Sequence, residues 1–275
     1  SYDLKTSIEM YETMAGHKSD RYQYALPTYN FSKNFYLKNA NGSFNFGSNG
    51  NNTLSNTNTV NSRITNNLTY NSMNNYSVIG IKTNYEIALK NTNTVGKKSS
   101  LYKNTPQSEL TSAYIFNTSL PLIKKTRYNL NALTPKISFR FSPHDMKNNR
   151  GGATRIDANN VFNSSRLSVS DSFEGGESMT IGLDFKKEKI NTKNENTRNE
   201  ITEIEEFLNI KLATVYRLDE EDKIPTISTL NKKTSNIFGR LNFKPSKIFS
   251  LDYDFSLTNN LHTFEYNSIL ASLNS

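Results

Sequence analysis

The sequence predicts an all-β protein, an antiparallel transmembrane β-barrel to which this chain contributes about a dozen strands. Apolar and polar residues alternate with a period of two along much of the chain, which is typical of strands with one apolar and one polar face. Only 35% of the 275 residues are hydrophobic, fewer than a compact soluble protein of this length needs for its core. Aromatic residues make up 11%, more than disordered chains contain. No apolar run approaches the roughly 18 residues of a transmembrane helix.

Each predicted strand is a segment in which apolar and polar residues alternate. The clearest segments are residues 79–89 and 249–257. The others lie, in chain order, at 2–10, 22–26, 44–46, 60–70, 110–116, 137–141, 179–185 and 237–243. Residues 201–217 fit helical spacing as well as alternation, and we expect a strand over 207–217 because its neighbours are strands. A part of a barrel would form an open curved sheet with two exposed edges.

The connections between these segments differ in length. Long polar stretches occupy residues 47–58, 90–108, 142–160, 187–205 and 218–235, whereas residues 244–247 leave room only for a tight turn. Long outer loops and tight inner turns are typical of outer-membrane barrels.

Alternation alone does not tell which face of the sheet is buried. A soluble secreted β-sandwich or adhesin would bury the apolar face, whereas a membrane barrel turns that face toward lipid. Strand-like segments of nine to eleven residues, the low apolar content and aromatic residues near the segment ends favour the barrel. We therefore expect a lipid-facing set of residues, namely Ile79, Ile81, Tyr85, Ile87, Leu89, Leu251, Tyr253 and Phe255. The expected lumen-facing residues are Lys82, Glu86, Lys136, Arg140 and Lys211, with Asp252 and Asp254 on the same side.

The composition limits the chemistry that this chain can perform. It contains no Cys, which excludes a disulfide scaffold, a thiolate metal site and a Cys nucleophile within the chain. Its three His residues do not have the spacing of a zinc site or a nucleophile motif. The net charge of +8 suggests an anionic partner, but the basic residues are scattered and form no nucleic-acid motif. We expect no catalytic residue, cofactor, metal or nucleic acid.

Acidic residues cluster in two of the polar stretches. Asp171, Glu174 and Glu177 lack the regular ligand spacing of a calcium loop, and we expect them to form a solvated loop. We expect the same of residues 219–222, and we interpret His144 and Asp145 as a surface pair.

The chain begins with Ser1 and enters strand-like alternation at Tyr2, so we expect it to be an internal fragment of a longer protein. All of residues 1–275 would then belong to one barrel domain.

Three segments carry a resemblance to a known family. They are Leu26-Pro27-Thr28-Tyr29, the Leu-Pro elements of 119–122 and 133–143, and the run 160–176 with its acidic Gly-containing turn, followed by the strand 179–185. Together they resemble the barrel of the lipopolysaccharide-assembly family LptD of Gram-negative outer membranes. The family's periplasmic jelly-roll domain and its cysteines have no counterpart in this chain.

The resemblance implies an outer-membrane transporter that inserts lipopolysaccharide into the outer leaflet. It implies lipopolysaccharide, a plug lipoprotein of the LptE type, periplasmic bridge proteins and membrane lipid as partners. The expected lumen-facing cations would contact the substrate or the plug, or remain hydrated wall residues. A porin, a siderophore-type transporter and a soluble sandwich or adhesin stay open as alternatives.

Overall fold

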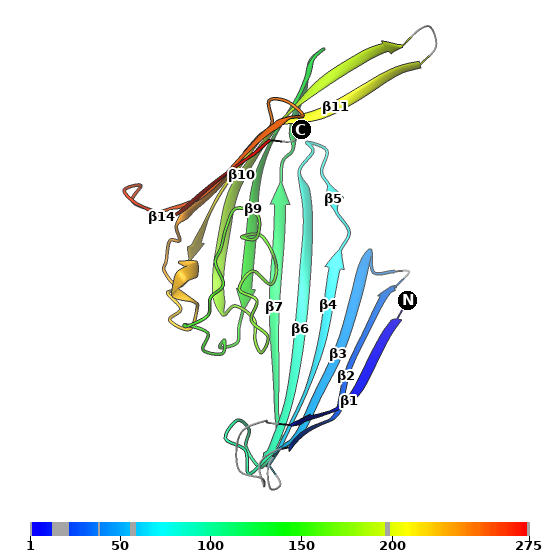
Figure 1. Ribbon diagram of the computed structural model, residues 1–275, viewed down its shortest axis with the longest axis vertical. Helices are drawn as coiled ribbons and strands as arrows, with labels where there is room; N and C mark the ends of the chain where they lie inside the picture. Colours follow the sequence, from blue (N-terminus) through cyan, green and yellow to red (C-terminus); the bar gives the residue numbers. More distant parts are fainter. Residues whose placement is uncertain (1, 13–21, 38, 56–58, 196–198, 274–275) are drawn as a thin grey trace. The chain divides into compact units, whose positions relative to one another are not determined.

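The computed structural model describes residues 2–12, 22–37, 39–55, 59–195 and 199–273, without the side chains of 191–203. This part of the chain forms one sheet of 14 antiparallel strands, in the order β1-β2-β3-β4-β6-β7-β9-β10-β11-β12-β13-β14, with β5 paired to β6 and β8 to β9 (Figure 1). The strands are β1 (Tyr2–Glu12), β2 (Tyr22–Tyr36), β3 (Gly42–Ser55), β4 (Thr59–Ser72), β5 (Asn75–Tyr76), β6 (Lys82–Lys97), β7 (Gln107–Ser119), β8 (Leu122–Lys125), β9 (Asn129–Ser142), β10 (Gly176–Glu195), β11 (Asn199–Arg217), β12 (Ile237–Phe243), β13 (Phe249–Leu257) and β14 (Phe264–Leu273). The predicted all-β antiparallel fold is thus confirmed.

No helix in the described residues has the length and hydropathy needed to cross a bilayer.

The chain divides into two compact units. Unit 1 comprises residues 1–73, 85–114 and 171–173, and unit 2 comprises residues 74–84, 115–170 and 174–275.

Unit 1 contains a row of aromatic rings on one face of β2, β3, β4 and β6. The ring of Phe35 stacks on Phe44 at 5.3 Å between centroids, Phe44 lies 4.8 Å from Tyr70, and Tyr70 lies 5.6 Å from Tyr85. The row forms because Phe35, Phe44 and Tyr70 are direct cross-strand partners. Such pairs stabilise a sheet beyond its backbone hydrogen bonds.

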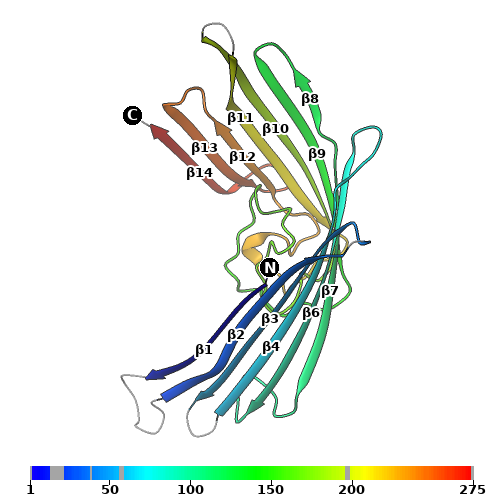
Figure 2. The same ribbon diagram turned by 90° about the vertical axis from the view of Figure 1, so that its right-hand side faces the viewer.

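In unit 2, strands β8 to β14 run side by side (Figure 2). The register places apolar residues on one face and polar or small residues on the other. We call the first the apolar face; on β9, β10, β11 and β13 it carries Ile137, Phe139, Phe141, Met179, Ile181, Leu183, Phe185, Ile210, Leu212, Tyr216, Leu251, Tyr253 and Phe255. We call the other the polar face; it carries Lys136, Arg140, Ser178, Thr180, Asp184, Lys211, Arg217, Arg240, Asp252 and Asp254.

Two long connections of unit 2, residues 143–175 and 218–236, pack on the polar face. Apolar side chains of these connections form a core with residues of β11 and β12. The core consists of Met146, Ile156, Ala158, Val161, Leu167, Ala213, Val215, Ile224, Leu230 and Phe238. Among the described residues, no second sheet covers the apolar face, and Phe139 and Tyr216 on it are 48% and 43% exposed. The buried core of this unit therefore lies on the polar side of the sheet.

Several predicted boundaries were wrong. The region 47–58, expected as a loop, belongs to β3 as far as Ser55. Within 187–205, expected as a connection, residues 187–195 and 199–205 form the long ends of β10 and β11. β6 continues to Lys97, so only the second half of 90–108 is a connection. β14 was not predicted. In these segments backbone pairing with a neighbour determines the strand, and β3 pairs with β4 along its whole length although its residues are mostly polar.

The predicted strand 79–89 begins three residues later than expected. Ile79 and Ile81 lie in the turn between β5 and β6, where Ser77 N donates to Ile81 O at 2.9 Å and Gly80 N to Ser77 O at 3.0 Å. Gly80 has a φ of +85°, which ends the alternation because such a backbone conformation does not fit a strand. The predictions for 207–217, 237–243 and 249–257 are confirmed.

Candidate functional site

A ladder of charged side chains crosses the polar face from β9 to β13. Lys136 forms an ion pair with Asp184, which is the cross-strand partner of Lys211. Arg240 is the next partner of Lys211 and lies between Asp252, at 3.2 Å, and Asp254, at 3.5 Å. Two cations of the ladder, Lys211 and Arg240, are thus direct cross-strand partners, and carboxylates flank them on β10 and β13.

An open hollow lies on this ladder. It is lined by Asn159, Glu206, Asn209, Lys211, Arg240 and Asn242. Asn159 comes from the long connection 143–175, and its amide oxygen accepts a hydrogen bond from Lys211 Nζ at 3.0 Å. The hollow presents amide and charged donors and acceptors, the groups that recognise hydroxyl-rich or phosphorylated molecules. No cluster of three or more metal-ligating His, Asp or Glu side chains occurs in the described residues.

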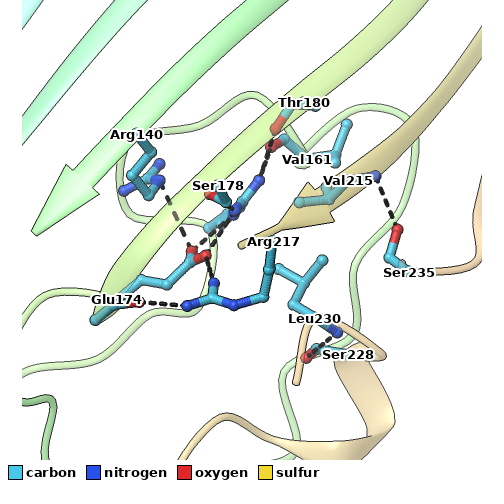
Figure 3. Close-up of polar contacts among 12 residues, drawn as sticks. Arg140, Val161, Glu174, Ser178, Thr180, Val215, Arg217, Ser228, Leu230 and Ser235 are labelled. Carbon is cyan, nitrogen blue, oxygen red and sulfur yellow. Dashed lines mark hydrogen bonds and ion pairs between the residues drawn. The ribbon is translucent and has the colours of Figure 1, made fainter. Parts of the chain in front are cut away.

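One buried carboxylate holds the connection 143–175 against the strands (Figure 3). Arg166 donates to Glu174 through two parallel hydrogen bonds, Nε to Oε2 at 2.7 Å and Nη2 to Oε1 at 2.6 Å. Arg217, the last residue of β11, donates from Nη1 to Glu174 Oε1 at 2.7 Å. Arg140 Nε, near the end of β9, lies 3.8 Å from Oε2. The four side chains are between 1% and 6% exposed, and we call them the Glu174 cluster.

The arginines of the Glu174 cluster are also bound to backbone and hydroxyl groups. Arg166 additionally donates from Nη1 to Val161 O and Thr180 Oγ1 and from Nη2 to Ser178 Oγ, so all five of its N–H groups are used. Arg140 donates to the carbonyl oxygens of Ser164 and Asn163, at 2.7 and 2.8 Å. The cluster therefore joins both arms of the connection to three neighbouring strands.

The pKa of Glu174 reflects this surrounding. Burial alone would raise the pKa of the carboxyl group, because a charged form is poorly solvated there. Arg166 opposes this by charge and hydrogen bonding, with Arg140 and Arg217 adding to the effect, and together they lower the pKa to about 2. Glu174 is thus ionised at neutral pH, and the expectation of a solvated loop was wrong for it.

Unit 1 has a smaller polar arrangement of its own. Arg63 on β4 forms an ion pair with Asp171, and Lys90 on β6 donates to Ser172 O at 3.3 Å. The Lys90 ammonium also lies 4.9 Å from the ring centroid of Phe173. Residues 171–173 are thereby bound to the same face of β4 and β6.

The structure brings together some of the residues predicted to face a lumen. Lys136 and Lys211 belong to the charged ladder, and Arg140, on the same face, belongs to the Glu174 cluster. Lys82 and Glu86 occupy even-numbered positions of β6 and therefore share one face of the strand, whereas Tyr85 and Ile87 occupy odd-numbered positions on the other face.

Of the residues predicted to face lipid, Leu251, Tyr253 and Phe255 lie on the apolar face of unit 2. Ile79 and Ile81 lie in the turn before β6, so no strand face determines their direction. Which face meets lipid stays a prediction for both sets.

Sequence reasoning named Glu174 but expected it in a solvated loop, and it missed Arg166, Arg217 and Arg240 as site residues. The nearest signal for Glu174 in the sequence was the pair Gly175-Gly176, which follows it directly and stands where β10 begins. Nothing in local spacing connects it to Arg140 or Arg217, which are 34 and 43 residues away in the chain.

Comparison with known proteins agrees with this architecture. The family model described as LptD, LPS transport system D, matches residues 1–275, the whole chain. A comparison with curated proteins found no match. The expected resemblance is thus confirmed over a larger range than the motifs covered. An all-β antiparallel sheet with an apolar and a polar face, matched over its full length by this model, makes the chain a member of the LptD family of outer-membrane lipopolysaccharide transport proteins.

Proposed function

We propose that residues 1–275 are part of one outer-membrane barrel domain that inserts lipopolysaccharide into the outer leaflet of a Gram-negative cell. The observation that supports this most directly is the separation of the two faces of unit 2. In the proposal the apolar face contacts membrane lipid, and the polar face with its charged ladder lines the lumen.

The dimensions of the apolar face suit a bilayer. On β10, the apolar side chains between Glu177 and Lys187 are Met179, Ile181, Leu183 and Phe185. The ten residue-to-residue steps from Glu177 to Lys187 extend over about 33 Å of strand. At a tilt of about 40° this gives a height of about 25 Å, which is the apolar band of outer-membrane barrels.

The polar face suits the head group of the substrate. Lipopolysaccharide carries phosphates and many sugar hydroxyls, and the hollow offers Lys211 and Arg240 beside the amides of Asn159, Asn209 and Asn242. We infer that these groups exchange hydrogen bonds with the head group as it passes. Each contact is weak because Arg240 is already paired with Asp252 and Asp254 and Lys211 lies opposite Asp184, which favours passage over tight binding.

The remaining partners belong to the same proposal. A plug lipoprotein of the LptE type would occupy the lumen, and periplasmic bridge proteins would deliver the substrate. Lys136 and Lys82 are the cations that we propose for contact with plug or substrate, besides Lys211.

Photo-crosslinking from neighbouring residues of β11 tests the proposal. A benzophenone amino acid replaces Asn209, which lines the hollow, or Ile210, which points to the apolar face, in the full-length protein in cells. We expect Asn209 to give a lipopolysaccharide adduct that disappears when the supply of new lipopolysaccharide is stopped. Adducts from Ile210 should form with bulk membrane lipid and persist. A persistent adduct at both positions, or none at Asn209, would contradict the lumenal assignment.

A further inference from the structure

On β8, β9 and β10 the apolar face of unit 2 changes from apolar to polar residues within a single row. The last fully apolar row across β8 to β13 is Leu122, Leu133, Phe185, Ile210, Leu241 and Tyr253. The next row toward the short connections is Lys124, Asn131, Lys187, Leu208, Phe243 and Leu251. Lys189 follows Lys187 on the same face of β10. Three lysines therefore border the apolar face at one end, and we call them the lysine rim.

A phenylalanine holds two of these lysines in place. The register shift after Lys187 pairs Glu188 with Glu206, so Phe207 on β11 has no partner residue on β10. The ring of Phe207 contacts Phe243 edge-on at 5.2 Å between centroids. The ammonium of Lys187 lies 5.3 Å and that of Lys189 4.2 Å from the centroid of this ring, both within the range of cation–π attraction.

The lysines of the rim differ from nearby lysines in whether a carboxylate lies within ion-pair distance. Lys186 lies 2.5 Å from Glu188, Lys247 lies 2.9 Å from Glu205, and Lys244 lies 3.9 Å from Glu206. In contrast, the described side chains place no carboxylate within ion-pair distance of Lys124, Lys187 or Lys189; Lys189 donates only to Pro245 O, at 3.4 Å. Two ammonium groups beside one ring repel each other, and an anion bound between them removes that repulsion.

We propose that the lysine rim binds the phosphate of an anionic phospholipid whose acyl chains lie along the apolar face. This goes beyond transport of lipopolysaccharide and uses the outer surface of the sheet instead of the hollow; it depends only on the apolar face meeting lipid. Lysines bury their aliphatic stems against apolar surface and place the ammonium at the level of lipid head groups. At the opposite end of the same face β10 carries Glu177, so the positive charge belongs to one membrane surface.

The lengths of the connections indicate which leaflet is involved. The connections at the rim end are short, 126–128 and 244–248. The other end carries the two long stretches 143–175 and 218–236 together with the short connection 258–263. Outer-membrane barrels have their short turns on the periplasmic side, where the leaflet consists of phospholipid. We therefore assign the rim to phospholipid and not to lipopolysaccharide.

The test measures the lipid that the full-length protein retains. The protein is purified in mild detergent, mixed with phosphatidylglycerol, phosphatidylethanolamine or lipopolysaccharide, and analysed by native mass spectrometry. We expect Lys187→Gln with Lys189→Gln to reduce phosphatidylglycerol binding roughly tenfold to thirtyfold, since each lysine near a charged membrane surface contributes about fivefold. Phosphatidylethanolamine binding should not change.

The matched control is Lys186→Gln with Lys244→Gln, which removes the same charge from nearby lysines that have acidic partners. It leaves Lys247 paired with Glu205, the cross-strand partner of Lys189. This control should retain phosphatidylglycerol binding. Lys187→Arg with Lys189→Arg should also bind phosphatidylglycerol as wild type does, which keeps the proposal testable if the glutamine variant of the rim folds poorly. Equal losses in the two glutamine variants, or unchanged binding in the rim variant, would overturn the proposal. Loss of lipopolysaccharide alone would also overturn it, because the rim would then lie in the other leaflet.

Discussion

Glu174 and Arg166 form a bidentate pair whose side chains are 2% and 1% exposed. The two residues lie only eight apart in the chain, on opposite arms of a turn that is closed by their two hydrogen bonds. Arg217 and Arg140 then connect this turn to β11 and β9. The pair thus lies at the centre of the contacts that hold a long connection on the sheet.

Replacing Glu174 by Gln should release this connection. The variant removes the carboxylate that three buried guanidinium groups share, and breaking a buried pair in this way costs about 3–5 kcal/mol. We expect faster hydrogen exchange and faster proteolysis within residues 143–175 while the strands of unit 2 remain paired. The control is Glu177→Gln, an exposed carboxylate three residues further on, which should leave both rates unchanged. Equal exchange in wild type and Glu174→Gln would show that the apolar core alone holds the connection.

The same carboxylate predicts a response to acid. Its pKa is about 2 in the folded protein and 4.5 ordinarily, so the folded state binds fewer protons between these values. The stabilisation, about 3 kcal/mol, is therefore fully present above pH 4.5 and is lost as the pH falls toward 2. Hydrogen exchange of residues 143–175, measured between pH 5 and pH 2 after correction for the intrinsic rate, should show growing exposure. Glu174→Gln should lack this pH dependence.

Gly182 should not tolerate a larger residue. A Cβ atom at this position would lie 2.6 Å from the Phe162 ring and 3.1 Å from the carbonyl oxygen of Leu212. We expect Gly182→Ala to displace Phe162 and to cost about 1–3 kcal/mol in unfolding free energy. Adding Phe162→Ala should recover part of that loss, so the two substitutions should be non-additive in a double-mutant cycle. Strict additivity would contradict the contact.

A charge on the apolar face should harm membrane assembly. Leu183 lies midway along the apolar residues of β10, where an arginine facing lipid costs about 2–4 kcal/mol. We expect Leu183→Arg to lower the heat-modifiable folded fraction in outer-membrane preparations, whereas Asn209→Arg on the polar face should not. Ile81→Arg is expected to be tolerated, because the structure places Ile81 in a turn and not in a strand. A folded fraction of Leu183→Arg equal to wild type would refute the lipid-facing assignment.

The sequence pattern predicted those strands that have one apolar and one polar face. Segments 237–243 and 249–257 have the predicted bounds because hydrophobic alternation and backbone pairing coincide there. β3 was only partly predicted, because its many Asn, Thr and Ser residues give no apolar face; its pairing with the next strand, β4, determines it instead. The same reason explains the long ends of β10 and β11, where backbone pairing determines the strands.

The candidate site was less accessible to sequence reasoning. Lys136, Arg140 and Lys211 could be placed on a polar face by parity alone, and they do share one. That Arg140 is buried could not be predicted, because burial depends on a connection folding back over the strand end. Parity gives the direction of a side chain but not what covers it.

The Glu174 cluster also makes closure of the connection depend on strand register. Arg140 and Arg217 reach the carboxylate only when β9, β10 and β11 are aligned as they are, with Ser178 opposite both residues. A slip of one residue would turn either arginine to the apolar face. Glu174 would then be buried with an incomplete set of counter-charges, and the connection could not close. A misaligned sheet would therefore present an open, protease-sensitive segment.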